Sequence, residues 1–103
     1  MGKHIEFEAK QTLNSTFSFS LMKEHQLSFL ITSNKKFNAL CFLIIHFYRL
    51  NKYYLITIDE IFKYIKEKSK KSIDEKDIKK IGYELTIIFP GILNLIEVIK
   101  KII

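Results

Sequence analysis

Lysines dominate the residues of this sequence that could do chemistry. Sixteen of its seventeen basic residues are lysines, the other is Arg49, and ten of the seventeen lie between Arg49 and Lys80. A lysine ammonium contacts phosphate as a point charge, whereas the planar guanidinium of arginine suits the edge of a guanine. Candidates for contacts with DNA phosphates, with little base specificity, are Lys70, Lys71, Lys76, Lys79 and Lys80. The alternative is a solvated helix face in a lysine-rich protein.

Two acidic pairs, at residues 59–60 and 74–75, could act as general acid and base. Each pair belongs to a longer motif, Thr-Ile-Asp-Glu at 57–60 and Ser-Ile-Asp-Glu at 72–75. In such a capping box the hydroxyl accepts a hydrogen bond from the backbone N–H three residues on, and the glutamate reaches back to the first residue. This single interpretation explains both pairs, so we predict two helix starts rather than a catalytic site.

Other catalytic patterns are absent from the sequence. The histidines His4, His25 and His46 are not at metal-ligand spacing, and Cys41, the single cysteine, cannot form a zinc site alone. Three glycines form no phosphate-binding loop. We therefore expect a protein without enzymatic activity, cofactor or metal, with Cys41 as a small buried hydrophobe.

The bulk composition favours one domain with an anionic partner. The chain has 103 residues and a net charge of +6, with 48% hydrophobic residues. Its uncharged stretches are shorter than the ~20 residues that a membrane-spanning helix needs. The N-terminus also lacks the basic-then-apolar order of a signal peptide. We expect a soluble intracellular protein that does not contact membranes.

Hydrophobic periodicity predicts the elements that position these lysines. Period-two alternation over residues 3–21 predicts strands or a loosely attached arm. The apolar run that ends near Leu50 predicts a central helix, with Ser33 or Asn34 as its N-cap. A short strand is expected at 53–56.

Two helices and a last strand should follow. The capping boxes predict a helix from Ile58 to about Lys68 and another from Ile73 to about Phe89. The dipeptide at 90–91, Pro-Gly, should stop the second of these, and residues 93–99 can return as a strand.

This order of elements is typical of a winged-helix, or helix-turn-helix, domain. The fold class expected is α+β and mainly helical, with a reduced wing because only one strand follows the last helix. The strands at 3–21 could supply the missing partner; a plain helical bundle with a frayed tail is the competing architecture. We divide the chain into N-terminal strands or an arm at 1–26 and a winged-helix domain at 27–103.

The order of motifs resembles one particular family. Thr57 and Ile58 open the second helix, Ile73 follows the second hydroxyl, and Phe89-Pro90 ends the third. This pattern is similar to the winged-helix domains of the eukaryotic replication-licensing factor that geminin restrains and that helps to load the MCM helicase. There the pattern is Thr-Phe, Arg-Phe and Tyr-Pro.

The resemblance implies a nuclear adaptor in DNA replication licensing. Its partners would be MCM helicase subunits, DNA bound without sequence preference, and a geminin-like inhibitor. Two alternatives stay open: a non-specific DNA-binding or transcription-type winged helix, and a protein-protein interaction domain with no nucleic-acid role. Outside the family, a cytoplasmic location is the alternative to the nucleus.

Overall fold

The computed structural model describes residues 5–21, 32, 39–88 and 92–102. The central strands are β1 (Ile5–Thr12), β3 (Leu40–Phe47), β4 (Lys52–Thr57) and β6 (Tyr83–Leu85). The helices are α2 (Ile58–Lys68), α3 (Glu75–Ile81) and α4 (Leu95–Ile102). Shorter elements complete the described part of the chain: β2 (Thr16–Ser18), η1 (Phe19–Leu21), η2 (Tyr48–Leu50), β5 (Ser72–Asp74), β7 (Ile87–Ile88) and β8 (Ile92–Leu93).

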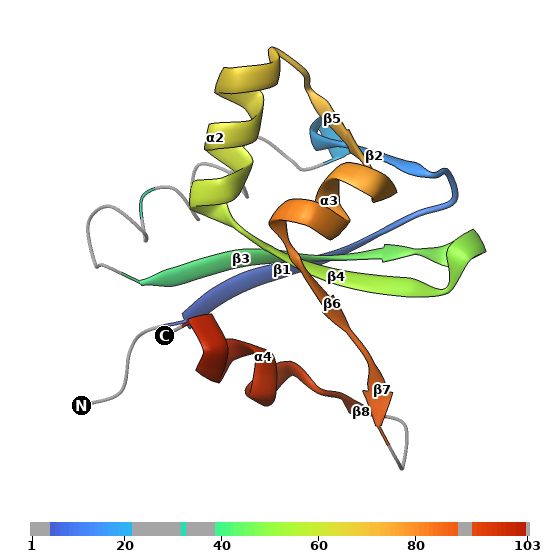
Figure 1. Ribbon diagram of the computed structural model, residues 1–103, viewed down its shortest axis with the longest axis vertical. Helices are drawn as coiled ribbons and strands as arrows, with labels where there is room; N and C mark the ends of the chain where they lie inside the picture. Colours follow the sequence, from blue (N-terminus) through green and yellow to red (C-terminus); the bar gives the residue numbers. More distant parts are fainter. Residues whose placement is uncertain (1–4, 22–31, 33–38, 89–91, 103) are drawn as a thin grey trace.

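A mixed sheet in the order β1-β3-β4-β6 forms the middle layer. Strand β1 runs parallel to β3, while β3, β4 and β6 are antiparallel to their neighbours. Helices α2 and α3 lie on one side of this sheet and α4 lies on the other (Figure 1). A two-stranded ribbon of β2 and β5 lies on the same side as α2 and α3.

Strand β3 occupies the segment for which a central helix was predicted, and that prediction is wrong. Seven of its eight residues, Leu-Cys-Phe-Leu-Ile-Ile-His-Phe, are buried. A strand covered on both faces is apolar at nearly every position, so it loses the alternation that would distinguish it from a buried helix. The proposed caps of that helix, Ser33 and Asn34, lie outside the described residues.

Side chains on the two faces of β3 contribute to two separate hydrophobic cores. Cys41, Leu43 and Ile45 pack with residues of α2, α3, β2 and β5 on one side. Phe42 and Ile44 pack on the other side with residues of β4, β6 and α4. As predicted, Cys41 is buried, and its pKa is raised by this burial and by the nearby carboxylates of Glu6 and Asp59.

Helix capping agrees with the sequence at the first box and differs at the second. The Thr57 side chain accepts a hydrogen bond from the Glu60 backbone N–H, so α2 begins where expected. Ser72 instead lies in β5, and Asp74 caps α3 by accepting from the Asp77 backbone N–H at 2.8 Å. The motif signalled a helix start correctly but two residues early.

Helix α3 ends at Ile81, well short of the predicted Phe89. Gly82 follows it, and a Cβ at this position would lie 2.7 Å from the Leu55 carbonyl oxygen of β4. The absence of a side chain therefore lets the chain approach the sheet and join it as β6. Residues 89–91, which include the predicted Pro-Gly stop, lie outside the described residues.

The C-terminal segment is helical, although a strand was predicted over 93–99. Leu95, Val98, Ile99 and Ile102 recur at helical spacing, and all four pack on the second core. The loose alternation of the same segment concealed this stripe. A hairpin of β7 and β8 precedes α4.

The mainly helical winged-helix fold is therefore wrong. Strands and helices contribute about equally to the described residues, and a mixed sheet replaces the helical core. The predicted strands at β1 and at 53–56 are present as β1 and β4. The proposed boundary between residues 26 and 27 lies in a range that is not described, so the division into two parts stays a prediction. No helix among the described residues is long and apolar enough to cross a membrane.

Candidate functional site

Edge strand β1 presents its charged residues to the face of the sheet that α2 and α3 cover. Glu6, Glu8 and Lys10 are half-buried, whereas Ile5 and Phe7 are 39% and 47% exposed. The register with β3 pairs the three charged residues with Cys41, Leu43 and Ile45, which belong to the core under α2 and α3. Both faces of β1 therefore border a core: the charged residues face α2 and α3, while Ile5 and Phe7 face the second core and stay partly exposed at the sheet edge.

Pairing with β3 fixes this orientation. Eight consecutive residue pairs join the two strands in one register, and the Phe7 ring stacks on Phe42 at 5.3 Å between ring centroids. Turning β1 over would require a one-residue slip along the whole strand. Inward charges are also one of the ways in which proteins protect an open sheet edge.

Two carboxylates and an amine on one strand face suit the binding of a phosphate and a divalent cation. Magnesium is commonly held by one or two carboxylates together with substrate phosphates and water. Glu6 and Glu8 fit such a shared site. No three His, Cys, Asp or Glu side chains come together as a metal site within residues 5–21, 39–88 and 92–102. A cage made by the described side chains alone is thus not present.

All five lysines proposed from the sequence are exposed, and the structure brings three of them together. Lys70 and Lys71 line one hollow with Thr16, Tyr64 and Ser72. Lys76 lines the neighbouring hollow with Ser15, Leu50 and Glu75. Asp74 borders both hollows. Lys79 and Lys80 lie in the last turn of α3 and border neither.

Acidic side chains at the start of α3 have structural partners. The Tyr54 hydroxyl donates to Glu75, and the Tyr64 hydroxyl donates to Asp77 at 2.8 Å. Burial, followed by the Glu75 hydrogen bond, raises the pKa of Tyr54. Burial, followed by the Asp77 hydrogen bond, raises the pKa of Tyr64 to about 12. These contacts attach α3 to the sheet and to α2.

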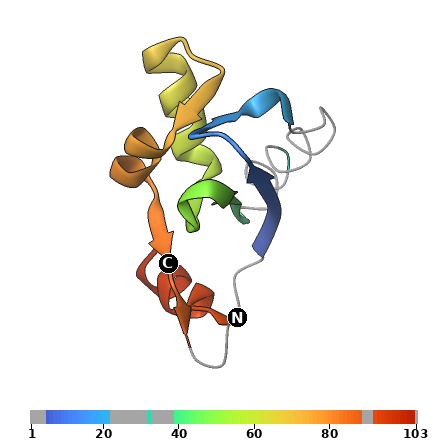
Figure 2. The same cartoon turned by 90° about the vertical axis from the view of Figure 1, so that its right-hand side faces the viewer.

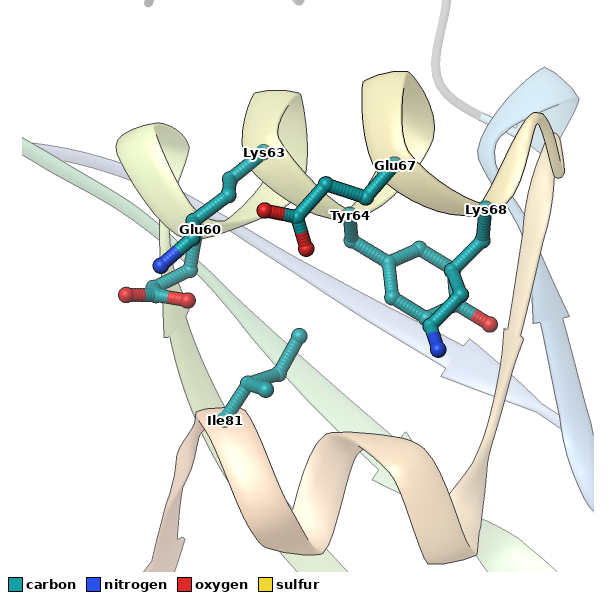
Figure 3. Close-up of a pocket in the computed structure, with 6 residues that line it drawn as sticks. All are labelled: Glu60, Lys63, Tyr64, Glu67, Lys68 and Ile81. Carbon is teal, nitrogen blue, oxygen red and sulfur yellow. The ribbon is translucent and has the colours of Figure 1, made fainter.

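A further pocket lies between α2 and α3 (Figure 3). Its charged lining is balanced between two glutamates and two lysines, all from α2: Glu60, Lys63, Glu67 and Lys68. Tyr64 and Ile81 complete it. With no excess of positive charge, this pocket does not favour a phosphate.

The alternation over residues 3–21 predicted a strand here but did not single out its charged residues. Glu6 and Glu8 alternate with Ile5 and Phe7 along that strand. In the structure the charged residues pair with the core under α2 and α3, and the apolar residues pair with the second core. Three charged residues at period two on one strand are the signal that could have marked the site.

The chain was compared with known proteins. A family model described as Recombination protein U matches residues 1–101. The Holliday junction resolvase RecU of Ureaplasma parvum is 37% identical over 101 residues, which cover 98% of this chain and 59% of that protein. The resolvase of the same name from Pediococcus pentosaceus is 34% identical over 106 residues, covering 99% and 52%. The corresponding protein of Staphylococcus aureus is 33% identical over 106 residues, covering 99% and 50%. The chain thus spans about half to three-fifths of the length of these relatives.

These matches overturn the functional expectations. The similarity to a replication-licensing factor is wrong, and with it the MCM helicase subunits and the geminin-like inhibitor as partners. Two alternatives had been left open: a non-specific DNA-binding or transcription-type winged helix, and a protein-protein interaction domain with no nucleic-acid role. Neither fits better. A nuclear location is wrong because the relatives are bacterial. The expectation of a non-enzyme is wrong as well, since the relatives are named for an enzymatic reaction.

Proposed function

Because the chain belongs to the Recombination protein U family, we propose that it provides the cutting strand and part of the DNA surface of a Holliday junction nuclease. The substrate is four-way branched DNA and the reaction is hydrolysis of a phosphodiester bond. Strand β1 is the β-strand that carries the catalytic residues, and we call it the cutting strand. The observation that favours this role for β1 is the row of Glu6, Glu8 and Lys10, which are half-buried on the face of the sheet that α2 and α3 cover.

Each member of the β1 row has a role in this proposal. Glu6 and Glu8 would hold a divalent cation together with a phosphate of the DNA. The bound cation would polarise the phosphoryl oxygen and lower the pKa of a coordinated water. Lys10, two residues further along the same face, places an ammonium where it stabilises the negative charge that develops on the phosphate. Their half-buried setting strengthens these interactions relative to water.

The exposed lysines hold the DNA arms in this proposal. Lys70 and Lys71 line a hollow in which Asp74 is the acidic residue, and they contact phosphates there. Lys76 contacts a phosphate from the exposed surface of α3, because its own hollow also holds Asp74 and Glu75. Lys79 and Lys80 extend the positive surface along α3. Lysines contact phosphates without selecting bases, which suits an enzyme that recognises a branched shape rather than a sequence. Binding should weaken as salt rises, in proportion to the number of phosphates contacted.

Cleavage of a synthetic four-way junction tests the proposal. The chain should bind the junction and cut it in the presence of Mg²⁺. Glu8→Gln, which keeps the size of the side chain but removes its charge, should reduce the cutting rate by at least about a hundredfold, the scale of a lost transition-state contact. Binding in a gel-shift assay should change little in this variant.

A matched control separates a local effect from general loss of charge. Glu84→Gln, on β6 at the opposite edge of the sheet from β1, removes an exposed carboxylate that pairs with Lys52 at 3.2 Å, and this variant should cut normally. Equal cutting by wild type and the Glu8 variant would show that β1 is not the cutting strand. Failure to bind the junction at all would contradict the whole proposal.

A further inference from the structure

The tip of the β3–β4 hairpin exposes two large apolar side chains on either side of the only arginine in the chain. This tip is η2, in which Tyr48 is 58% exposed and Leu50 is 45% exposed, with Arg49 exposed between them. Exposed apolar side chains at a hairpin end contribute little to folding. Two such side chains beside a cation make the tip a candidate binding element.

One backbone hydrogen bond and two ring contacts restrain the tip. Asn51 closes it in the left-handed region, with φ 50° and ψ 45°, and its N–H donates to the Tyr48 carbonyl at 3.1 Å. The Tyr48 ring packs edge-on against His46, which itself stacks on Tyr53 at 4.0 Å between centroids. A rigid aromatic loses little conformational entropy when it contacts a partner.

The position of the tip links it to both parts of the proposed DNA surface. Figure 2 looks onto this end of the molecule, where η2 faces the viewer between α3 and the β1–β2 segment. Leu50 shares a hollow with Ser15 of the β1–β2 turn and with Lys76 of α3. In the β1–β3 register, Lys10 lies opposite Ile45, three residues before Tyr48, a distance of about 10 Å along a strand. The Tyr48 ring itself packs on the other face of the sheet, against His46.

The chemistry of the tip matches an unstacked base rather than an intact duplex arm. Every base has a π-face on which tyrosine can stack, and apolar side chains such as leucine insert between base steps as wedges. Arg49 can pair with a phosphate beside such a step. Continuous stacking is interrupted where the four arms of a junction meet, so inserting a side chain there disrupts less stacking than within a duplex.

We propose that Tyr48, Arg49 and Leu50 form a wedge that occupies the branch point of a four-way DNA junction and gives the chain its preference for branched over linear DNA. This inference rests on the proposed function, because it assumes that the chain binds junctions. The wedge contacts the branch point while the lysines around α3 contact the arms.

Fluorescence of 2-aminopurine placed at the branch point tests the wedge. Binding of the wild-type chain should change the emission of the probe. Tyr48→Ala should remove most of this change and lower the ratio of junction to linear-duplex affinity about tenfold, the scale of one lost stacking contact. Tyr48→Phe, which keeps the ring, should retain both properties. Ile96→Ala, at a 70% exposed position of α4, is the matched control and should behave as wild type.

The outcomes distinguish this inference from the proposed function. If wild type binds and cuts the junction but Tyr48→Ala keeps the full preference and the full probe signal, the wedge is wrong and the nuclease stands. If both the Tyr48 and Ile96 variants lose the preference, the effect belongs to general surface hydrophobicity and the wedge is likewise wrong. If wild type shows no junction preference over linear duplex, both proposals fail.

Discussion

Two tyrosine–carboxylate pairs set how the fold responds to pH. Tyr54 donates to Glu75 and Tyr64 donates to Asp77, and in each pair burial favours the neutral phenol. The acidic residues that resemble a catalytic pair in the sequence are therefore parts of the scaffold. Both pairs join α3 to its neighbours.

The Tyr64 pair leads to a prediction about alkaline stability. The pKa of Tyr64 is raised from 10.0 to about 12 in the folded protein. Below pH 10 both states keep the phenol protonated, so the stabilisation is complete. Between pH 10 and pH 12 the unfolded chain loses this proton more readily, and the free energy of unfolding falls. Tyr64→Phe should make this fall shallower in urea titrations taken across that range.

Tyr83→Phe provides the comparison for this measurement. Tyr83 is 38% exposed and lies in β6, away from the Asp77 pair. Its replacement should leave the pH dependence of unfolding unchanged. If the free energy of unfolding fell equally steeply with pH in wild type and in Tyr64→Phe, the Tyr64–Asp77 pair would not stabilise the fold.

The start of α3 provides a prediction at the level of the element. Asp74, rather than Ser72, accepts the hydrogen bond from the first turn. Asp74→Ala should lower the free energy of unfolding by about 1 kcal/mol, as is typical of a lost N-cap, while Asp74→Asn should retain most of it. Ser72→Ala should have the smaller effect. Denaturant unfolding followed by circular dichroism compares the three, and a larger loss for Ser72→Ala would contradict the cap assignment.

Elements with an amphipathic pattern were predictable from the sequence, and those without one were not. Helix α2 follows its capping box and its apolar spacing, and β4 follows a short run of β-forming residues. Strand β3 is buried on both faces and has no period of its own. Its assignment depends on pairing with β1 and β4, which a local pattern does not contain.

At the scale of the whole molecule, the sheet fixes the positions of the β1 row, the lysines and the hairpin tip relative to one another. The five lysines were identified by charge, but their grouping depends on the fold, which places Lys70, Lys71 and Lys76 beside the β1–β2 turn. The β1 row was missed because alternating charges on a strand usually face solvent, whereas here α2 and α3 cover that face of the sheet. The family was misassigned because apolar positions after a hydroxyl residue are common to many helix pairs.

The location of a bound divalent cation tests the central claim most directly. Mn²⁺ broadens the NMR signals of nearby amides, and it can be added at low levels to the chain in the presence of a short DNA strand that supplies phosphates. Broadening should centre on residues 6–10 of β1 and on their β3 partners, and it should disappear in Glu8→Gln. Broadening centred instead on the acidic start of α3, residues 74–77, or unchanged by the Glu8 substitution, would contradict the assignment of β1 as the cutting strand.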